Sequence, residues 1–267
     1  MHKSALTNAA SFFQVYLAHR EELTIVDIGS QDVNGSLRSV VPPQHRYIGV
    51  DFASGNGVDV VLTDPYVYPF DSDSVDCVVS SSCFEHSEFF WLSFLEMVRI
   101  LRNGGIIYLN VPSNGLFHRY PVDCWRFYPD SGNALARWAH TNGYDLVPLE
   151  SFVSNQDTQD GQFAWNDFVA VFLKGSNNLA NVGDTRMMDF KKDVTNGLRT
   201  LSSGTQSDFE NFTEPSEDQK MALPFKMTRS LIGLEERSQE PARDRKIVLD
   251  SVSTEVESEE QNASDLQ

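Results

Sequence analysis

Residues 24–35 read Thr24-Ile25-Val26-Asp27-Ile28-Gly29-Ser30-Gln31-Asp32-Val33-Asn34-Gly35. The β-branched run before Gly29 is typical of a buried strand in a parallel sheet. A glycine directly after such a strand lets the backbone turn tightly and approach a ligand at the carboxyl edge of the sheet. A strand–turn–helix junction with a purely structural glycine would give the same pattern, so these residues alone leave both interpretations open.

Short apolar runs of the same kind recur along the chain and alternate with segments of helical spacing. Besides residues 24–28, the predicted strands are residues 47–50, 58–62, 75–79, 106–111, 144–153 and 167–173. The predicted helices are residues 4–20, 88–101 and 130–141. Buried strands that alternate with helices predict an α/β fold, with a mostly parallel seven-stranded sheet and helices on both faces.

The aromatic residues indicate where the folded domain ends. All four Trp, all eight Tyr, the three Cys and the six His lie before Lys174. Large aromatic side chains supply much of the buried area of a core, so we predict a domain over residues 22–174, with an N-terminal helix in residues 1–21 that packs on it. Residues 175–267 are polar and acidic, which predicts a mostly disordered tail. Within it, residues 221–232 have enough apolar content to dock as a short helix on the domain or on a protein partner.

Charge and cysteine content disfavour several classes of protein. The formal net charge of −17 disfavours nucleic-acid binding, which needs Lys and Arg side chains against phosphates. The three Cys are too few and too irregularly spaced for a disulfide framework or a four-ligand zinc site, and no metal-ligand cluster is visible from spacing. We expect no signal peptide and no membrane span, and therefore a cytoplasmic protein with reduced thiols.

Asp51 follows the second predicted strand, about twenty residues after Gly29. An acidic side chain at this position can accept hydrogen bonds from both hydroxyls of an adenosyl ribose. An Asp that caps a loop is the alternative. Gln31 occupies the second glycine position of the dinucleotide-binding pattern Gly-x-Gly-x-x-Gly, which disfavours a nicotinamide-dependent oxidoreductase.

Five segments, taken in order, resemble the motifs of class I S-adenosylmethionine-dependent methyltransferases, and the methyltransferase-11-like group in particular. They are Asp27-Ile28-Gly29, Tyr47-Ile48-Gly49-Val50-Asp51, Pro69-Phe70 with Ser74-Val75-Asp76-Cys77-Val78-Val79-Ser80, Phe84-Glu85-His86, and Arg99-Ile100-Leu101-Arg102-Asn103-Gly104-Gly105. The resemblance covers residues 22–173. Residues 31–36 and 120–127 further resemble a bacterial subgroup often associated with glycan modification.

This resemblance implies a Rossmann-like methyltransferase fold with S-adenosylmethionine as the cofactor. The implied cofactor-binding residues lie at the ends of the first four strands: Asp27, Gly29, Ser30, Gln31, Asp51, Phe52, Asp64, Ser80 and Ser81. Asp27 and Gly29 would hold the methionine end, Asp51 the ribose, and Asp64 the adenine amino group. Thr63 could take the place of Asp64, because this loop is one residue longer than the usual version.

Methylation of a hydroxyl benefits from a general base, worth about two to four orders of magnitude, and histidine with a pKa near ~6.5 suits that role. His118 lies in the loop after the fifth predicted strand, where Asp123 could orient its ring. Alternatively, Asp123 forms a structural ion pair with Arg126. His86 is the second candidate base, and its alternative role is a hydrogen-bonded part of the pocket wall.

The sequence therefore predicts an S-adenosylmethionine-dependent methyltransferase. The expected acceptor is a sugar, a glycan precursor or another small hydroxylated molecule, an expectation that rests on resemblance. The alternative is a catalytically silent Rossmann-like module that acts as a scaffold through its tail.

Overall fold

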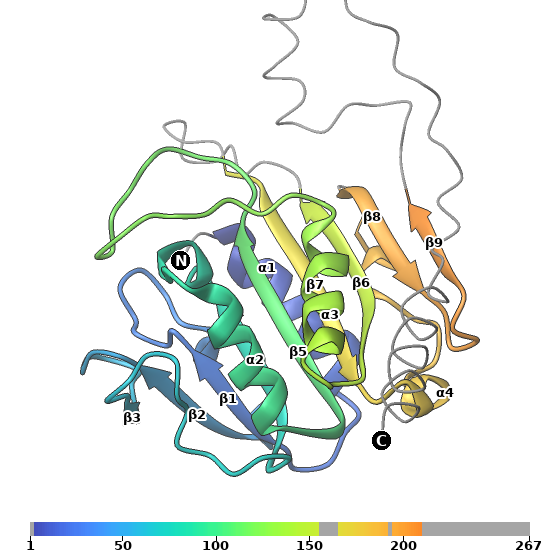
Figure 1. Cartoon of the computed structure of the whole chain (residues 1–267), viewed down its shortest axis with the longest axis horizontal. Coiled ribbons are helices and arrows are strands. Elements are labelled where there is room, and N and C mark those ends of the chain that lie inside the picture. Colours follow the sequence, from blue (N-terminus) through green and yellow to red (C-terminus); the bar gives the residue numbers. More distant parts are fainter. Residues whose placement is uncertain (1–2, 155–164, 192–193, 210–267) are drawn as a thin grey trace, which may run out of the picture. The chain divides into compact units, whose positions relative to one another are not determined.

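The computed structural model describes residues 3–154, 165–191 and 194–209. Over these residues the chain forms one nine-stranded sheet with the strand order β3-β2-β1-β4-β5-β7-β6-β8-β9 (Figure 1). The strands are β1 (Thr24–Ile28), β2 (Arg46–Asp51), β3 (Val60–Val61), β4 (Val75–Ser81), β5 (Leu101–Pro112), β6 (Leu146–Ser154), β7 (Asp167–Lys174), β8 (Val194–Thr200) and β9 (Gln206–Phe209). Strands β1 to β5 pair in parallel, whereas β7 is antiparallel to β5 and β6, and β8 is antiparallel to β6 and β9.

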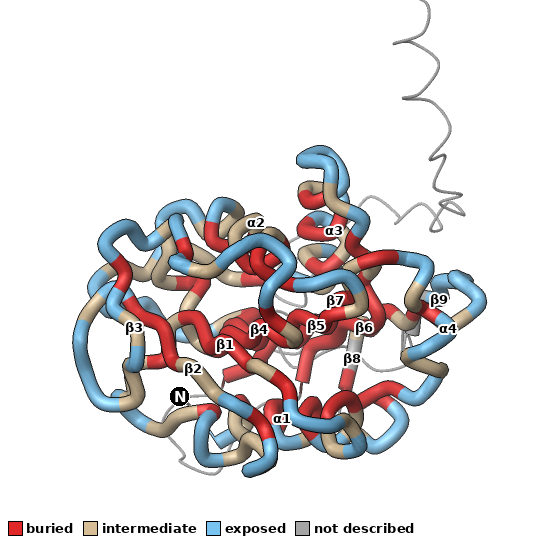
Figure 2. Tube along the Cα trace, turned by 90° about the horizontal axis from the view of Figure 1, so that it is seen from below, coloured by how far each residue is buried: buried red, intermediate tan, exposed pale blue. Residues whose placement is uncertain are grey.

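Helices cover both faces of the sheet, as the sequence predicts. Helix α1 (Lys3–Phe12), which continues as a π-helix (Phe13–Leu17), lies on one face, and α2 (Phe90–Ile100) and α3 (Ser131–Thr141) lie on the other (Figure 2). The shorter helical elements are η2 (Leu37–Ser39), η3 (Phe84–His86), η4 (Ser176–Asn178), α4 (Leu179–Val182) and η5 (Met187–Asp189). Within the described ranges, no helix is long and apolar enough to cross a membrane.

Each face of the sheet has its own apolar core. On the α1 face, Phe12 stacks on Tyr108 of β5 with ring centroids 4.6 Å apart. On the opposite face, Phe94 of α2 packs edge-to-face on Phe172 of β7 with ring centroids 5.3 Å apart. Burial of these two layers fixes the α/β architecture predicted from the alternating pattern.

The ordered domain extends past residue 174, where the sequence analysis places the start of the tail. Strands β8 and β9 add to the sheet beside β6. The fully buried guanidinium group of Arg186 donates hydrogen bonds to the carbonyl oxygens of Leu149 (3.3 Å) and Thr200 (2.6 Å). The aromatic count misplaces the boundary because this extension is held by backbone pairing and a buried polar network. Predictions for residues 210–267, including the docking helix, lie outside the described residues.

The strand register brings the candidate cofactor residues to one edge of the sheet. Ile28 pairs with Val50 of β2 and with Ser80 of β4. The residues that follow these positions, Gly29, Asp51 and Ser81, are therefore neighbours at the carboxyl edge of the parallel strands. Ligands of open α/β sheets bind at this edge.

Candidate functional site

A cavity of about 430 Å³ lies at this carboxyl edge. Its volume falls in the range of ~300–1,000 Å³ that is usual for small-ligand sites. Five of the predicted cofactor residues line it: Gly29, Gln31, Asp51, Phe52 and Ser81. The loop after β5 supplies another part of the wall, through residues 118–122.

The turn after β1 requires glycine at position 29. Gly29 has φ = +81°, in the left-handed region that L-residues with a side chain disfavour. A Cβ atom added there would lie 2.5 Å from the Sγ atom of Cys83. The amide groups of Gly29 and Ser30 both donate to the carbonyl oxygen of Val50, at 2.9 and 3.1 Å, which anchors the turn to β2.

Asp51 presents a buried carboxylate in the cavity wall. Its two oxygens accept hydrogen bonds from the backbone amides of Gln31 (3.1 Å) and Ala53 (3.2 Å). Because each carboxylate oxygen can accept more than one hydrogen bond, both still have capacity for a ligand. This arrangement suits a vicinal pair of hydroxyl groups.

The two serines at the end of β4 have different environments. Ser81 lines the cavity, and its buried hydroxyl group has no hydrogen-bond partner among the described residues. Ser80 is fully buried and donates to the carbonyl oxygen of Ile28 at 2.9 Å, which ties β4 to β1. Ser81 is therefore available to a ligand, whereas Ser80 has a structural partner.

Other predicted cofactor residues do not reach the cavity wall. Asp27 is buried and accepts a hydrogen bond from the hydroxyl group of Tyr47, and burial raises the pKa of its carboxyl group to about 7. Ser30 is buried against Gly49. The carboxylate of Asp64 is exposed and accepts from the amide of Tyr66 at 2.8 Å.

Apolar and aromatic neighbours of Thr63 and Asp64 line one part of the cavity. Neither Thr63 nor Asp64 lines the wall, whereas Leu62, Pro65 and Tyr66 do. Phe52, which is 53% exposed, also lines it. The side chains of this segment that line the cavity therefore lie on either side of Thr63 and Asp64.

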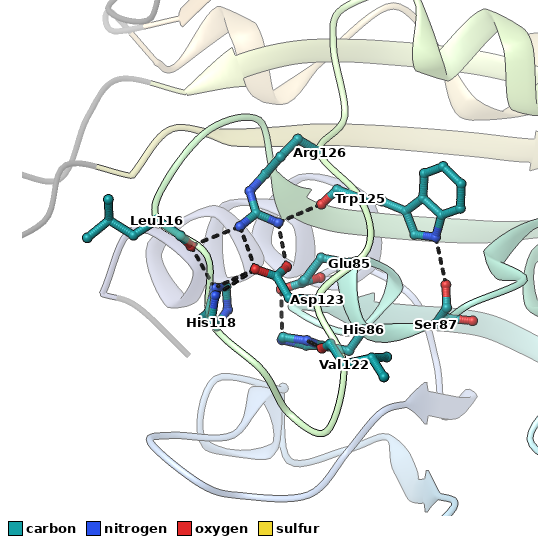
Figure 3. Close-up of polar contacts among 9 residues, drawn as sticks. All are labelled: Glu85, His86, Ser87, Leu116, His118, Val122, Asp123, Trp125 and Arg126. Atoms are coloured by element: carbon teal, nitrogen blue, oxygen red, sulfur yellow. Dashed lines mark hydrogen bonds and ion pairs between the residues drawn. The ribbon is translucent and has the colours of Figure 1, made fainter.

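Figure 3 shows Asp123 between His118 and Arg126. Arg126 donates to both carboxylate oxygens of Asp123, at 2.6 and 2.9 Å, and holds the pKa of that carboxyl group down at about 2. The backbone amide of His118 also donates to Asp123 at 2.7 Å, and the Nδ1 atom of the His118 ring lies 3.5 Å from the same carboxylate. Asp123 thus holds the loop through the ion pair with Arg126 and contacts His118 mainly through the backbone.

His86 and His118 lie together in the cavity wall. Their rings meet edge-to-face with centroids 4.9 Å apart, and burial lowers the pKa of His86. Beside them, burial raises the pKa of Glu85, a residue to which the sequence analysis gives no role, to about 8. Although spacing suggested no metal-ligand cluster, one ligand atom from each of Glu85, His86 and His118 lies within 4.8 Å of the others.

A further contact that the sequence did not predict joins the two sides of the cavity. The hydroxyl group of Tyr120 donates to the side-chain oxygen of Gln31 at 3.1 Å. The loop after β5 and the turn after β1 are thereby linked across the cavity. A glycine at position 31, as in the dinucleotide-binding pattern, could not form this link.

Residues 10–109 match the model of a methyltransferase domain, methyltransferase-11. Comparison with curated proteins gave no match. Among solved structures, a 1,6-didemethyltoxoflavin N1-methyltransferase from Burkholderia thailandensis, with bound 1,6-didemethyltoxoflavin and S-adenosylhomocysteine, aligns at TM-score 0.50 and 16% identity over 64% of this chain and 79% of its own. An S-adenosylmethionine-dependent methyltransferase from Archaeoglobus fulgidus aligns at TM-score 0.48 and 13% identity over 65% of this chain and 94% of its own.

The cavity fits the cofactor that this family uses. Gly29 provides the close turn, Asp51 offers unfilled acceptor capacity, and Ser81 carries a buried hydroxyl group without a partner among the described residues. The family model covers the strands and turns that contain these three residues. The chain therefore carries an S-adenosylmethionine-dependent methyltransferase domain that matches the methyltransferase-11 model over residues 10–109, as its sequence motifs predict.

Proposed function

We propose that the protein methylates a hydroxyl group of a small acceptor such as a sugar or a glycan precursor. When bound, S-adenosylmethionine supplies an electrophilic methyl group on a sulfonium. Gly29, Gln31, Asp51, Phe52 and Ser81 would hold it. The observation that carries the proposal is the pair of histidine rings in the same cavity wall, with centroids 4.9 Å apart.

Hydroxyl acceptors are favoured because the cavity offers a group that can take their proton. The Nδ1 atom of His118 lies 3.1 Å from the carbonyl oxygen of Leu116. A carbonyl oxygen only accepts hydrogen bonds, so Nδ1 carries the proton and Nε2 is left as a base. We propose that His118 removes the hydroxyl proton, with Asp123 keeping the loop in place.

The side chains that line the cavity support a small acceptor. Aromatic side chains from three segments, Tyr66, Tyr120 and Trp165, line the cavity, and such faces suit the C–H surface of a sugar ring. The net charge of −17 disfavours a nucleic-acid acceptor. The three cysteines are free thiols, which supports a reducing compartment such as the cytoplasm.

The test is a methylation screen with the full chain. Sugars, nucleotide sugars, phenols and matched amines are incubated with S-adenosylmethionine, and methylated products are identified by mass spectrometry. We expect products methylated at oxygen. Methylation confined to nitrogen or sulfur acceptors would contradict the proposal.

Replacing His118 tests the base. His118→Gln should lower turnover by about 10²–10⁴-fold, the usual contribution of a general base. Affinity for S-adenosylhomocysteine, measured by calorimetry, should stay within twofold (~0.4 kcal/mol) of the unsubstituted protein. His140→Gln, at an exposed position in the last turn of α3, is the matched control and should change neither quantity. Full activity in His118→Gln would remove the base role.

A further inference from the structure

We propose that Glu85, His86 and His118 form a binding site for a divalent metal ion in the acceptor part of the cavity. One ligand atom from each residue lies within 4.8 Å of the other two, and all three residues line the cavity. A carboxylate and two imidazoles are a ligand set used by catalytic zinc sites and by other first-row divalent ions. Binding of the ion is independent of the proposed function, and only its catalytic role rests on it.

Both histidines are held in a tautomer that leaves Nε2 free to bind a metal ion. The Nδ1 atom of His86 contacts the carbonyl oxygen of Val122, and that of His118 contacts the carbonyl oxygen of Leu116 (Figure 3). Each Nδ1 must donate, because the carbonyl oxygen can only accept, and each Nε2 therefore keeps its lone pair. Metal-ligating histidines usually donate their other ring N–H to a carbonyl or carboxylate in this way.

Glu85 supplies a buried carboxyl group that lacks a full set of partners. Its side chain is 2% exposed, and its Oε2 atom has no hydrogen-bond partner among the described residues. The other oxygen, Oε1, lies 3.7 Å from Nε2 of His86. A buried carboxylate without enough donors is costly, and a bound cation would offset that cost.

Hydrogen bonds hold the backbone around Glu85 and His86. The carbonyl oxygen of Glu85 accepts from the amide of Cys124 at 2.7 Å, and the amide of His86 donates to Cys83 at 2.9 Å. His118, whose side chain is 40% exposed, lies in the loop after β5.

These distances are compatible with a shared ion after a small adjustment. Ligand atoms ~2.0–2.2 Å from a tetrahedral ion are about 3.4 Å apart, which is close to the separation between Glu85 and His86. Since no separation in the cluster exceeds 4.8 Å, His118 would complete the site once its ligand atom came about 1.4 Å closer to the other two.

The ligand set leaves at least one coordination position open toward the cavity. An acceptor hydroxyl near the ion would lose its proton more easily: the O–H bond breaks, the proton passes to solvent water, and the electron pair stays on oxygen, where the positive charge stabilises it. In the metal-loaded protein His118 is then a ligand of the ion, and the ion promotes the loss of the hydroxyl proton to water. In the metal-free protein His118 keeps the base role.

The test measures metal binding directly on the full chain. After dialysis against a chelator, the protein is titrated with Zn²⁺ by calorimetry, and with Co²⁺ by its visible absorption spectrum. We expect one ion per chain and a Co²⁺ spectrum of nitrogen and oxygen ligands, without the thiolate bands that Cys83 or Cys124 would produce. Glu85→Gln and His118→Gln should each weaken Zn²⁺ binding more than tenfold, whereas the exposed control His140→Gln should leave it unchanged.

The outcomes separate this proposal from the preceding one. No stoichiometric binding by the unsubstituted protein, or equal affinity in His118→Gln, would overturn the metal site. Calorimetry with S-adenosylhomocysteine checks that each variant retains the cofactor site and hence its fold. Methyl transfer that continues at full rate after the ion is removed would overturn the catalytic role of the ion and leave hydroxyl methylation standing.

Discussion

Alanine at position 29 is the substitution for which the structure makes its sharpest prediction. Gly29 has φ = +81°, and Gly143, after helix α3, has φ = +82°. An added Cβ atom at position 29 would lie 2.5 Å from Sγ and 2.6 Å from Cβ of Cys83, whereas at position 143 it would meet nothing within 4 Å. The two glycines therefore share the backbone strain and differ in the steric contact.

The expected magnitudes follow from these two terms. Placing a side chain in the left-handed region costs roughly 1–2 kcal/mol in each variant. Overpacking against Cys83 adds about 1–3 kcal/mol in Gly29→Ala alone, because a contact between two Cβ atoms is relieved only by moving backbone. Gly29→Ala should therefore be less stable than Gly143→Ala by about 1–3 kcal/mol.

Urea unfolding followed by tryptophan fluorescence measures the stability difference, and calorimetry measures binding of S-adenosylhomocysteine. Since Gly29 and Cys83 both line the cavity, Gly29→Ala should also weaken binding by about tenfold or more, or ~1.4 kcal/mol. Gly143→Ala should retain full affinity. Equal destabilisation of the two variants would refute the packing of Cys83 on Gly29, and with it the close turn below the cavity.

Two further substitutions test the carboxylates near the cofactor site. Asp51→Ala should weaken binding of S-adenosylhomocysteine by about 1.5–3 kcal/mol for each charged hydrogen bond lost, and unchanged affinity in calorimetry would remove Asp51 from the ribose site. The carboxyl group of Asp27 has a pKa of about 7 in the folded protein, raised from 3.8 in the unfolded chain. Between these two pH values the folded protein keeps a proton on Asp27 that the unfolded chain has lost. Stability should therefore fall by up to about 4 kcal/mol as pH rises from about 4 to 7. Asp27→Asn should flatten this fall in urea unfolding at several pH values, and an unchanged slope would show that another group causes it.

The strands that form the site could be predicted because their sequences are locally consistent. The runs that end at Ile28, Val50 and Val79 are β-branched and short, and each continues into a polar residue or glycine. In a parallel sheet these ends meet at one edge, so the approach of Gly29 and Asp51 follows from order and register. Strand β8 was not predicted, because its pairing with β6 is set by tertiary contacts and not by its own composition.

Side-chain direction was the part that sequence could not supply. Asp27 and Asp51 are both at or near strand ends. Asp51 lines the cavity, whereas Asp27 is buried and accepts a hydrogen bond from the hydroxyl group of Tyr47. The direction of Asp27 depends on a residue twenty positions away whose ring packs beside it. For the same reason, spacing did not reveal that His118 meets Glu85 and His86, since this contact depends on the path of the loop after β5.

Around the cavity, several carboxyl groups are buried, although ionisable side chains are ordinarily expected at the protein surface. Ionisable groups are seldom buried, because desolvation of a charge is costly. Nevertheless Asp51, Glu85 and Asp167 are each less than a tenth exposed and line the same cavity. Where these carboxyl groups are ionised, they create a negative potential that favours cationic ligands, and both a sulfonium and a divalent ion are cations. Binding of such ligands would offset the desolvation cost that folding alone leaves in place, so the local departure from ordinary burial is itself evidence for the chemistry of the site.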